Sequence, residues 1–207
     1  MKELFFVRHG QTEWNAIRRM QGQWNSDLSD LGRQQAATNG RFLQQVGIDY
    51  MIASPLDRTQ QTATIIATAL DMGFDSDDRL MEWDCGDWSG EMYADLSDLW
   101  PQEYAAWQAD LFNCRPPNAE NYPDMIERAK PLLARLLASS HQSIAIVSHG
   151  MIGRAMVGTL LAMSPDQMLA FNQSNETILH LSQRAAGFLP QHYVGGAGPF
   201  AGLPQRD

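Results

Sequence analysis

The sequence predicts an α/β fold, a three-layer sandwich in which helices flank a mostly parallel central sheet, with a small helical cap insertion. Three short, continuously apolar runs, residues 4–7, 50–54 and 143–148, are typical of strands buried on both faces. The segments between them repeat apolar residues with a period near 3.6, which indicates amphipathic helices. Strands that alternate with helices favour a parallel sheet covered by helices on both faces.

Helices are expected after each of these strands. Apolar residues follow the helical period over 31–46, again over 56–70, and once more over 152–160. Two later runs, ETILHLSQ and GFLPQHYV, alternate between apolar and polar residues and predict edge strands.

The domain organisation follows from the remaining segments. Residues 1–194 are expected to form one domain, in which the tryptophan-rich region of about 88–123 is an inserted helix and loop that acts as a cap. Residues 195–207, GGAGPFAGLPQRD, are predicted to be a loose C-terminal tail.

Composition excludes several classes of protein. The 207 residues include 44% hydrophobic and 19% charged residues, as in a soluble globular domain, and the chain has no apolar run long enough to cross a membrane. The first residues do not resemble a secretory signal, so we expect a cytoplasmic protein. Cys85 and Cys114 form no CxxC pair, which argues against a disulfide framework or a zinc site. A net charge of -9 argues against a nucleic-acid partner, although a few clustered arginines can still bind an anion.

Charged and polar residues follow each predicted buried strand. Arg8 and His9 end the first strand, Arg58 lies in SPLDRTQQT after the second, and His149 ends the third. Ligands of open α/β sheets bind at the carboxyl ends of the strands, so these four side chains are expected to converge there on an oxyanion. Ser54 is predicted to cap the following helix, which places Arg58 in its anion-favouring first turn.

Each histidine also has a structural interpretation. We interpret His180 and His192 as ordinary structural residues, whereas His9 and His149 each stand beside a glycine at a strand-to-helix turn, as functional residues do. An arginine that leaves a buried strand needs an acidic partner, and Glu82 is the candidate.

The chain resembles the histidine phosphatase superfamily, in its phosphoglycerate mutase-like branch. Five motifs stand in that family's order: VRHGQTEWN, GxxxxxLSDLGRQQA from Gly22, SPLDRTQQTA, LMEWDCGDWSG and VSHGMIGR. The resemblance implies a phosphatase or phosphomutase that works through a phosphohistidine. It departs from the family at 119–121, where AEN replaces the common GES.

The resemblance also implies roles for individual residues. His9 matches the nucleophile, Glu82 the proton donor, and three further residues the phosphate pocket, namely Arg8, Arg58 and His149. Five more positions match substrate-binding residues: Asn15, Gln21, Gly22, Gly150 and Met151. No metal and no organic cofactor are implied.

The chemistry of these residue types is consistent with phosphoryl transfer. A neutral imidazole can attack through one ring nitrogen while the other donates to a backbone carbonyl, which is the state expected for His9. Two arginines and a protonated His149 would stabilise the charge on the phosphoryl oxygens. Glu82, between the strand-like DRLM and WDCGDW, would protonate the leaving alkoxide and later activate water.

Three functions besides a phosphatase stay open. The first is a cofactor-dependent phosphoglycerate mutase, which would share the core but needs a clamp for a second anionic group. Four cations between Glu82 and His149 are dispersed, namely Arg115, Arg128, Lys130 and Arg135, and of these Arg115 is the candidate for a mobile clamp. The second function is that of a non-catalytic module that binds a phosphate ligand. The third is that of a metal hydrolase with His9, His149 and Glu82 as ligands.

The expected partner is a small phosphorylated metabolite. The oligomeric state is open, and a dimer is one arrangement that the sequence allows.

Overall fold

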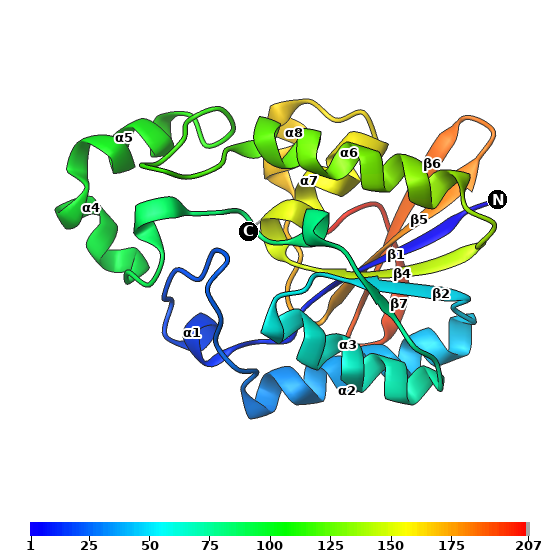
Figure 1. The fold of residues 1–207 in the computed structure, drawn as a ribbon. Helices are drawn as coiled ribbons and strands as arrows, with labels where there is room; N and C mark the ends of the chain where they lie inside the picture. Colours follow the sequence, from blue (N-terminus) through cyan, green and yellow to red (C-terminus); the bar gives the residue numbers. More distant parts are fainter. Residues whose placement is uncertain (206–207) are drawn as a thin grey trace.

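The computed structural model describes residues 1–205 and shows an α/β sandwich around one mixed sheet (Figure 1). Within this part of the chain the sheet has seven strands in the order β3-β2-β4-β1-β5-β6-β7. Four strands are parallel: β1 (Glu3–Arg8), β2 (Tyr50–Ala53), β3 (Asp75–Ser76) and β4 (Ser143–Ser148). Three are antiparallel: β5 (Thr177–Arg184), β6 (Gly187–Val194) and β7 (Ala197–Ala201). The predicted α/β class and parallel core are confirmed.

The three predicted buried strands lie side by side at the centre of the sheet. Arg8 pairs with Ser148, and Ala53 pairs with Val147, so the carboxyl ends of β1, β2 and β4 lie at one level. The residues that follow these strands therefore emerge together at a single edge of the sheet. Their apolar side chains point alternately to the two faces, which explains why the runs are continuously hydrophobic.

Helices cover both faces of the sheet (Figure 1). Helices α2 (Asp30–Val46) and α3 (Asp57–Leu70) lie on one face, over a core that includes Phe5, Val7 and Met51. Helices α6 (Tyr122–Ala138), α7 (Gly150–Leu160) and α8 (Pro165–Ala170) lie on the other, over a core that includes Leu4 and Phe6. Neighbouring residues of β1 thus belong to different cores.

The inserted region lies beyond the carboxyl ends of the strands, at the left of Figure 1. It contains α4 (Leu96–Leu99) and α5 (Pro101–Ala109), preceded by the 3-10 turns η2 (Gly86–Trp88) and η3 (Tyr93–Asp95). Trp88 and Trp107 pack edge to face, with ring centroids 5.4 Å apart. Such pairing joins the insertion to the core. The short helix α1 (Glu13–Ala16) borders the same end of the sheet.

Several predicted elements differ from the structure. The run DRLM, predicted as strand-like, forms the 3-10 turn η1 (Asp78–Leu80). Strand β5 is not an edge strand, because it lies between β1 and β6, and β6 in turn pairs with β7. Residues 197–201 of the predicted loose tail form β7, while 206–207 lie outside the described residues.

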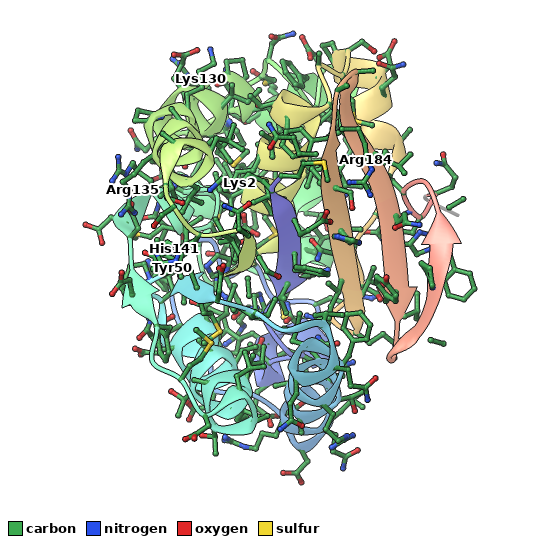
Figure 2. The ribbon with its side chains drawn as sticks, turned by 90° about the vertical axis from the view of Figure 1, so that its right-hand side faces the viewer. Lys2, Tyr50, Lys130, Arg135, His141 and Arg184 are labelled. Carbon is green, nitrogen blue, oxygen red and sulfur yellow. The ribbon has the colours of Figure 1, made fainter. Side chains whose placement is uncertain are left out.

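The opposite end of the sheet, where the parallel strands begin, is shown in Figure 2. There the Lys2 ammonium donates to the carbonyls of Ser139, at 2.6 Å, and His141, just beyond the end of α6. This cation satisfies the carbonyl of Ser139, the C-cap of α6, which the helix leaves unpaired. Among the described residues, no helix is long and apolar enough to span a membrane.

Candidate active site

His9 lies at the end of β1, buried, with a defined tautomer. Its Nδ1 is 2.7 Å from the carbonyl oxygen of Gly10, which can only accept, so Nδ1 carries the proton. Nε2 therefore carries no proton and has a free lone pair, and it lies 3.3 Å from Nε of Arg58. This is the arrangement that the sequence predicted for a neutral, nucleophilic imidazole.

Arg58 is held rigidly in the first turn of α3. Its Nη1 donates to the carbonyl of Trp24 and its Nη2 to that of Gly22, each at 2.7 Å. Its Nε faces both histidines, with His149 Nδ1 at 3.2 Å. Burial lowers the pKa of Arg58 to about 10, so the guanidinium stays cationic at neutral pH.

The N-terminus of α3 differs from the prediction. The helix begins at Asp57 with Leu56 as its N-cap, and no side chain caps it. Ser54, the predicted cap, instead has its Oγ 2.8 Å from Nε2 of His149. The Ser54 hydroxyl therefore orients the imidazole of His149 and does not cap the N-terminus of α3.

His149 is neutral in this structure, so the prediction of a protonated His149 is wrong here. Because Nδ1 accepts from Arg58, the ring proton lies on Nε2 and is donated to Ser54. Burial, followed by the charge of Arg58, holds the pKa of His149 well below its usual value. The same two causes lower the pKa of His9.

Arg8 supplies the second cation. Its Nη1 donates to the carbonyl of Gln173 at 2.8 Å, while its buried Nε makes no hydrogen bond to any described residue. Gly150 lies against this guanidinium. Burial lowers the pKa of Arg8, and the negative charge of Glu82 opposes that shift, as the predicted counter-charge should.

The Glu82 carboxylate sits at the N-terminus of α7. It accepts from the backbone N–H groups of Ile152 at 3.1 Å, Met151 at 3.2 Å and its own neighbour Trp83 at 2.9 Å. The free N–H groups and dipole of a helix N-terminus favour a negative charge at this place. Met151, predicted to bind substrate, thus contacts Glu82 through its backbone.

Of the other predicted substrate-binding residues, Gln21 and Gly22 lie beside the site, whereas the side chain of Asn15 caps a helix. Gln21 is only 8% exposed, and its buried Oε1 has no partner among the described residues. Gly22 has a positive φ of 49° and a Cβ there would lie 2.4 Å from Cys85 Sγ, so only glycine brings its carbonyl to Arg58. Asn15 is turned to a structural use, since its side chain accepts from Thr12 N in a capping box of α1.

Two supporting residues were missed by the sequence analysis. Thr62 accepts from Gly10 N at 3.1 Å and donates to Arg58 O at 2.8 Å, which ties β1 to α3. Asn175 donates to the carbonyl of His9 at 2.7 Å. The spacing of four residues from Arg58 could have indicated Thr62, because i and i+4 share a helix face. Nothing local links Asn175 to β1.

The geometry does not suit a metal centre. Residues 1–205 contain no group of three or more histidine, cysteine or carboxylate side chains placed to hold a metal ion. The facing nitrogens of His9 and His149 both accept from Arg58, whose positive charge would repel a cation. Cys85 is no rival nucleophile, because burial raises the pKa of its thiol to about 11.

The fold thus brings two guanidinium groups, which are the side chains that best bind an oxyanion, next to a histidine with a free lone pair. A family model described as the histidine phosphatase superfamily (branch 1) matches residues 4–194. The chain belongs to the histidine phosphatase superfamily.

Relatives carry the names of phosphatases and of mutases. Phosphoserine phosphatase 1 of Hydrogenobacter thermophilus is 30% identical over 187 residues, covering 89% of each chain. The probable phosphoglycerate mutase GpmB of Erwinia tasmaniensis is 34% identical over 199 residues, covering 94% of this chain and 91% of its own. A solved mycobacterial glucosyl-3-phosphoglycerate phosphatase, in complex with VO3, superposes with a TM-score of 0.83 at 28% identity, covering 96% of this chain and 100% of its own.

Proposed function

We propose that this protein is a phosphomonoester hydrolase that acts on small phosphorylated metabolites through a phosphohistidine at His9. The observation that carries the proposal is the fixed tautomer of His9, whose Nε2 lone pair lies 3.3 Å from Nε of Arg58, in a ring on which the charges of both Arg58 and Arg8 act. The names of the phosphatase relatives support the same class of reaction.

The proposed first step transfers the phosphoryl group to His9. Phosphate oxygens replace the imidazoles as acceptors of Arg58 Nε–H, which frees His9 Nε2 to attack phosphorus in line with the ester oxygen. The N–P bond forms as the P–O ester bond breaks, and Arg8 and Arg58 stabilise the charge on the equatorial oxygens.

Glu82 is proposed to manage the proton in both steps. The negative charge of the bound phosphate favours the acid form of Glu82, which protonates the leaving oxygen; as a carboxylate it then takes a proton from the water that attacks the phosphohistidine. The second step releases inorganic phosphate and returns His9 to its starting state. His149 keeps its role as a phosphate-binding residue, with Nδ1 available to a phosphate proton once the Nε–H of Arg58 donates to the phosphate instead.

The arrangement of the cations favours a phosphatase over a mutase. Arg115, the candidate clamp, is bound to Asp124 through two hydrogen bonds at the surface. Arg128 is bound to Glu120, and Arg135 to Asp77. None of the three is free to hold a second phosphate beside His9. A mutase also has to protect its phosphohistidine from water.

The mutase alternative has a direct test. The protein is incubated with 3-phosphoglycerate, with and without 2,3-bisphosphoglycerate, while free phosphate and 2-phosphoglycerate are measured separately. Release of phosphate as the main product is expected. Formation of 2-phosphoglycerate much faster than phosphate would reverse the assignment.

The covalent intermediate is tested at His9. His9→Ala should reduce hydrolysis of phenyl phosphate by at least about a thousandfold, because no other group is placed to attack. Quenching of wild type with SDS at alkaline pH during turnover of 32P-labelled ester should trap a base-stable phosphoprotein that the variant lacks, and its label should be lost on treatment with acid. A folded His9→Ala protein with activity within tenfold of an active wild type would refute the phosphohistidine at His9. If wild type itself hydrolyses no phosphate ester, the non-catalytic binding module is favoured instead.

The proton donor is tested by leaving group. Glu82→Gln should slow hydrolysis of alkyl phosphates much more than of 4-nitrophenyl phosphate, because a good leaving group departs without a proton. The ratio of the two kcat/KM values is the measurement. Equal losses on both esters would remove Glu82 from the role of general acid.

A further inference from the structure

Arg154 adds a third cation next to the phosphate pocket. It lies on α7 four residues after Gly150, so the two share a helix face, and a Cβ on Gly150 would lie 3.5 Å from the Arg8 guanidinium. One loop holds both arginines, because Phe171 O accepts from Arg154 Nε at 3.1 Å and Gln173 O accepts from Arg8 Nη1 at 2.8 Å. The positive charge of Arg154 contributes to the lowered pKa of Arg8.

The Arg154 guanidinium has no acidic partner. Its hydrogen bonds go to the carbonyl of Phe171 and, from Nη1, to the hydroxyl of Tyr122 at 2.8 Å, and no carboxylate within residues 1–205 forms an ion pair with it. Its guanidinium also lies over the Phe171 ring, with Cζ 5.8 Å from the ring centroid, so its charge is stabilised by neutral groups only and is available to an anion. By contrast, the neighbouring arginines of the insertion, Arg115 and Arg128, are each paired.

Arg154 also lines a cavity of about 170 Å³ between the insertion and α6, α7 and α8. The other lining residues are apolar or aromatic: Trp107, Leu111, Tyr122, Met151 and Leu169. Met151 connects this cavity to the site, because its backbone N–H donates to Glu82. An apolar cavity of about this volume is large enough for a single benzene ring.

We propose that this cavity binds the alcohol part of the substrate and that Arg154 binds a carboxylate on it. This rests on the proposed function, since it assigns the group that leaves when His9 takes the phosphate. The apolar walls suit a compact carbon skeleton beside the ester oxygen, and a guanidinium binds a carboxylate through two parallel hydrogen bonds. The substrate class is therefore a phosphomonoester with one carboxylate on a short or ring-shaped apolar body.

Arg154 follows His149 in the sequence, so it is not one of the four cations between Glu82 and His149. A single carboxylate clamp without a second phosphate clamp is consistent with hydrolysis rather than phosphate migration.

The test compares two aryl phosphates of equal shape, 4-carboxyphenyl phosphate and 4-carbamoylphenyl phosphate, together with their 3-substituted isomers. Wild type should prefer the carboxylate of at least one isomer pair by about fivefold or more in kcat/KM, mainly through KM, as one charge-assisted contact allows. Arg154→Gln should reduce that preference to less than about twofold, and Arg154→Lys should keep part of it. Lys130→Gln, which removes an exposed cation of α6 (Figure 2), is the matched control and should keep it in full.

A second pair of variants covers the structural contacts of Arg154. Leu111→Glu places a carboxylate in the cavity wall and should abolish the preference, whereas Leu111→Gln, of the same size, should retain it. Loss of the preference in both, or in neither, would contradict a charge-based subsite.

Measuring the affinity of the esters without turnover tests the carboxylate subsite independently of the proposed hydrolase activity. Calorimetry on His9→Ala measures the affinities for the two esters without turnover, and a tighter carboxylate in at least one isomer pair is expected. If neither isomer pair shows a preference in binding or turnover, the subsite is wrong even where phenyl phosphate is hydrolysed. If the carboxylate binds more tightly but wild type hydrolyses nothing, the subsite stands and the hydrolase proposal falls.

Discussion

At the scale of single residues, the hydrogen-bond partners of His9 and His149 determine which ring nitrogen of each carries the proton. The Gly10 carbonyl only accepts, which places the proton of His9 on Nδ1, and Arg58 only donates, which leaves lone pairs on both facing nitrogens. The state of His9 could be predicted from the residue types. That of His149 could not, because it depends on the position of Ser54 in space.

Thr62 offers a test of how far this geometry depends on residues outside the pocket. Thr62→Val keeps the shape but removes the acceptor of Gly10 N, so a buried donor loses its partner. We expect a loss of about 1–3 kcal/mol in the free energy of unfolding. We also expect a fall of about tenfold in kcat/KM for phenyl phosphate, because the Gly10 carbonyl that orients His9 is no longer held.

Thr62→Ser is the matched control, since it keeps the hydroxyl. Its kcat/KM should stay within about threefold of wild type, and urea unfolding reports the stability of both variants. A Thr62→Val protein that is destabilised but fully active would show that the hydrogen bond has a structural role only.

At the scale of elements, α2 is packed directly onto the loop that carries His9. Gly32 in its first turn leaves no room for a side chain, because a Cβ there would lie 2.0 Å from the carbonyl oxygen of Gln11. Ser29, the N-cap of α2, binds the same carbonyl. The helix therefore begins at a residue that fixes the catalytic loop as well as the helix end.

Gly32→Ala should consequently destabilise the protein by about 1–3 kcal/mol, as forced overpacking does, and reduce kcat as the loop shifts. Gly73→Ala, whose Cβ would meet nothing within 4 Å, is the control and should leave both unchanged. Thermal unfolding and phenyl phosphate turnover are the measurements. A Gly32→Ala protein as stable as the control would mean that the loop moves without cost.

The helices could be predicted well in their interiors and less well at their ends. Period 3.6 located α2, α3 and α7 because each buries one face against the sheet. The start of α3 was misplaced because Ser54 has the chemistry of a cap but serves His149. The prediction for the run DRLM was wrong because four residues are too few to distinguish a strand from a 3-10 turn.

At the scale of the whole molecule, the sequence predicted those site residues that parallel strands bring together. Arg8, His9 and His149 lie at the carboxyl ends of the neighbouring parallel strands β1 and β4. These ends lie side by side, so the sheet itself brings the three residues together. The positions of Gln173 and Arg154 depend instead on how the loop after α8 crosses the end of β1. The prediction that the two late runs are edge strands was wrong, because the alternation of residue types does not identify a strand's neighbours.

Burial of two neutral histidines makes the stability of the whole chain depend on pH. The pKa values of His9 and His149 lie well below the ordinary value of 6.5, mainly because both rings are buried. Once unfolded, each imidazole regains that ordinary pKa, so below about pH 6.5 the unfolded chain binds protons that the folded chain does not. The free energy of unfolding should therefore fall with decreasing pH, by at most roughly 2.7 kcal/mol per pH unit for the pair.

The window identifies the groups responsible. The pKa values of carboxyl groups such as Asp77 and Asp124 are lowered from their ordinary value of 3.8, so these groups change the free energy of unfolding mainly near and below pH 3.8. They contribute little to its pH dependence between about pH 5 and pH 6.5. Urea unfolding at about pH 5.3 and pH 7.5 should give a large difference for wild type and a smaller one for His9→Gln and for His149→Gln, because each variant removes one buried group that avoids protonation. The double variant should lose most of the difference. If it kept the full wild-type dependence, the protons would be taken up elsewhere in the unfolded chain, and the two imidazoles could not be the neutral pair that the hydrogen bonds of Arg58 require.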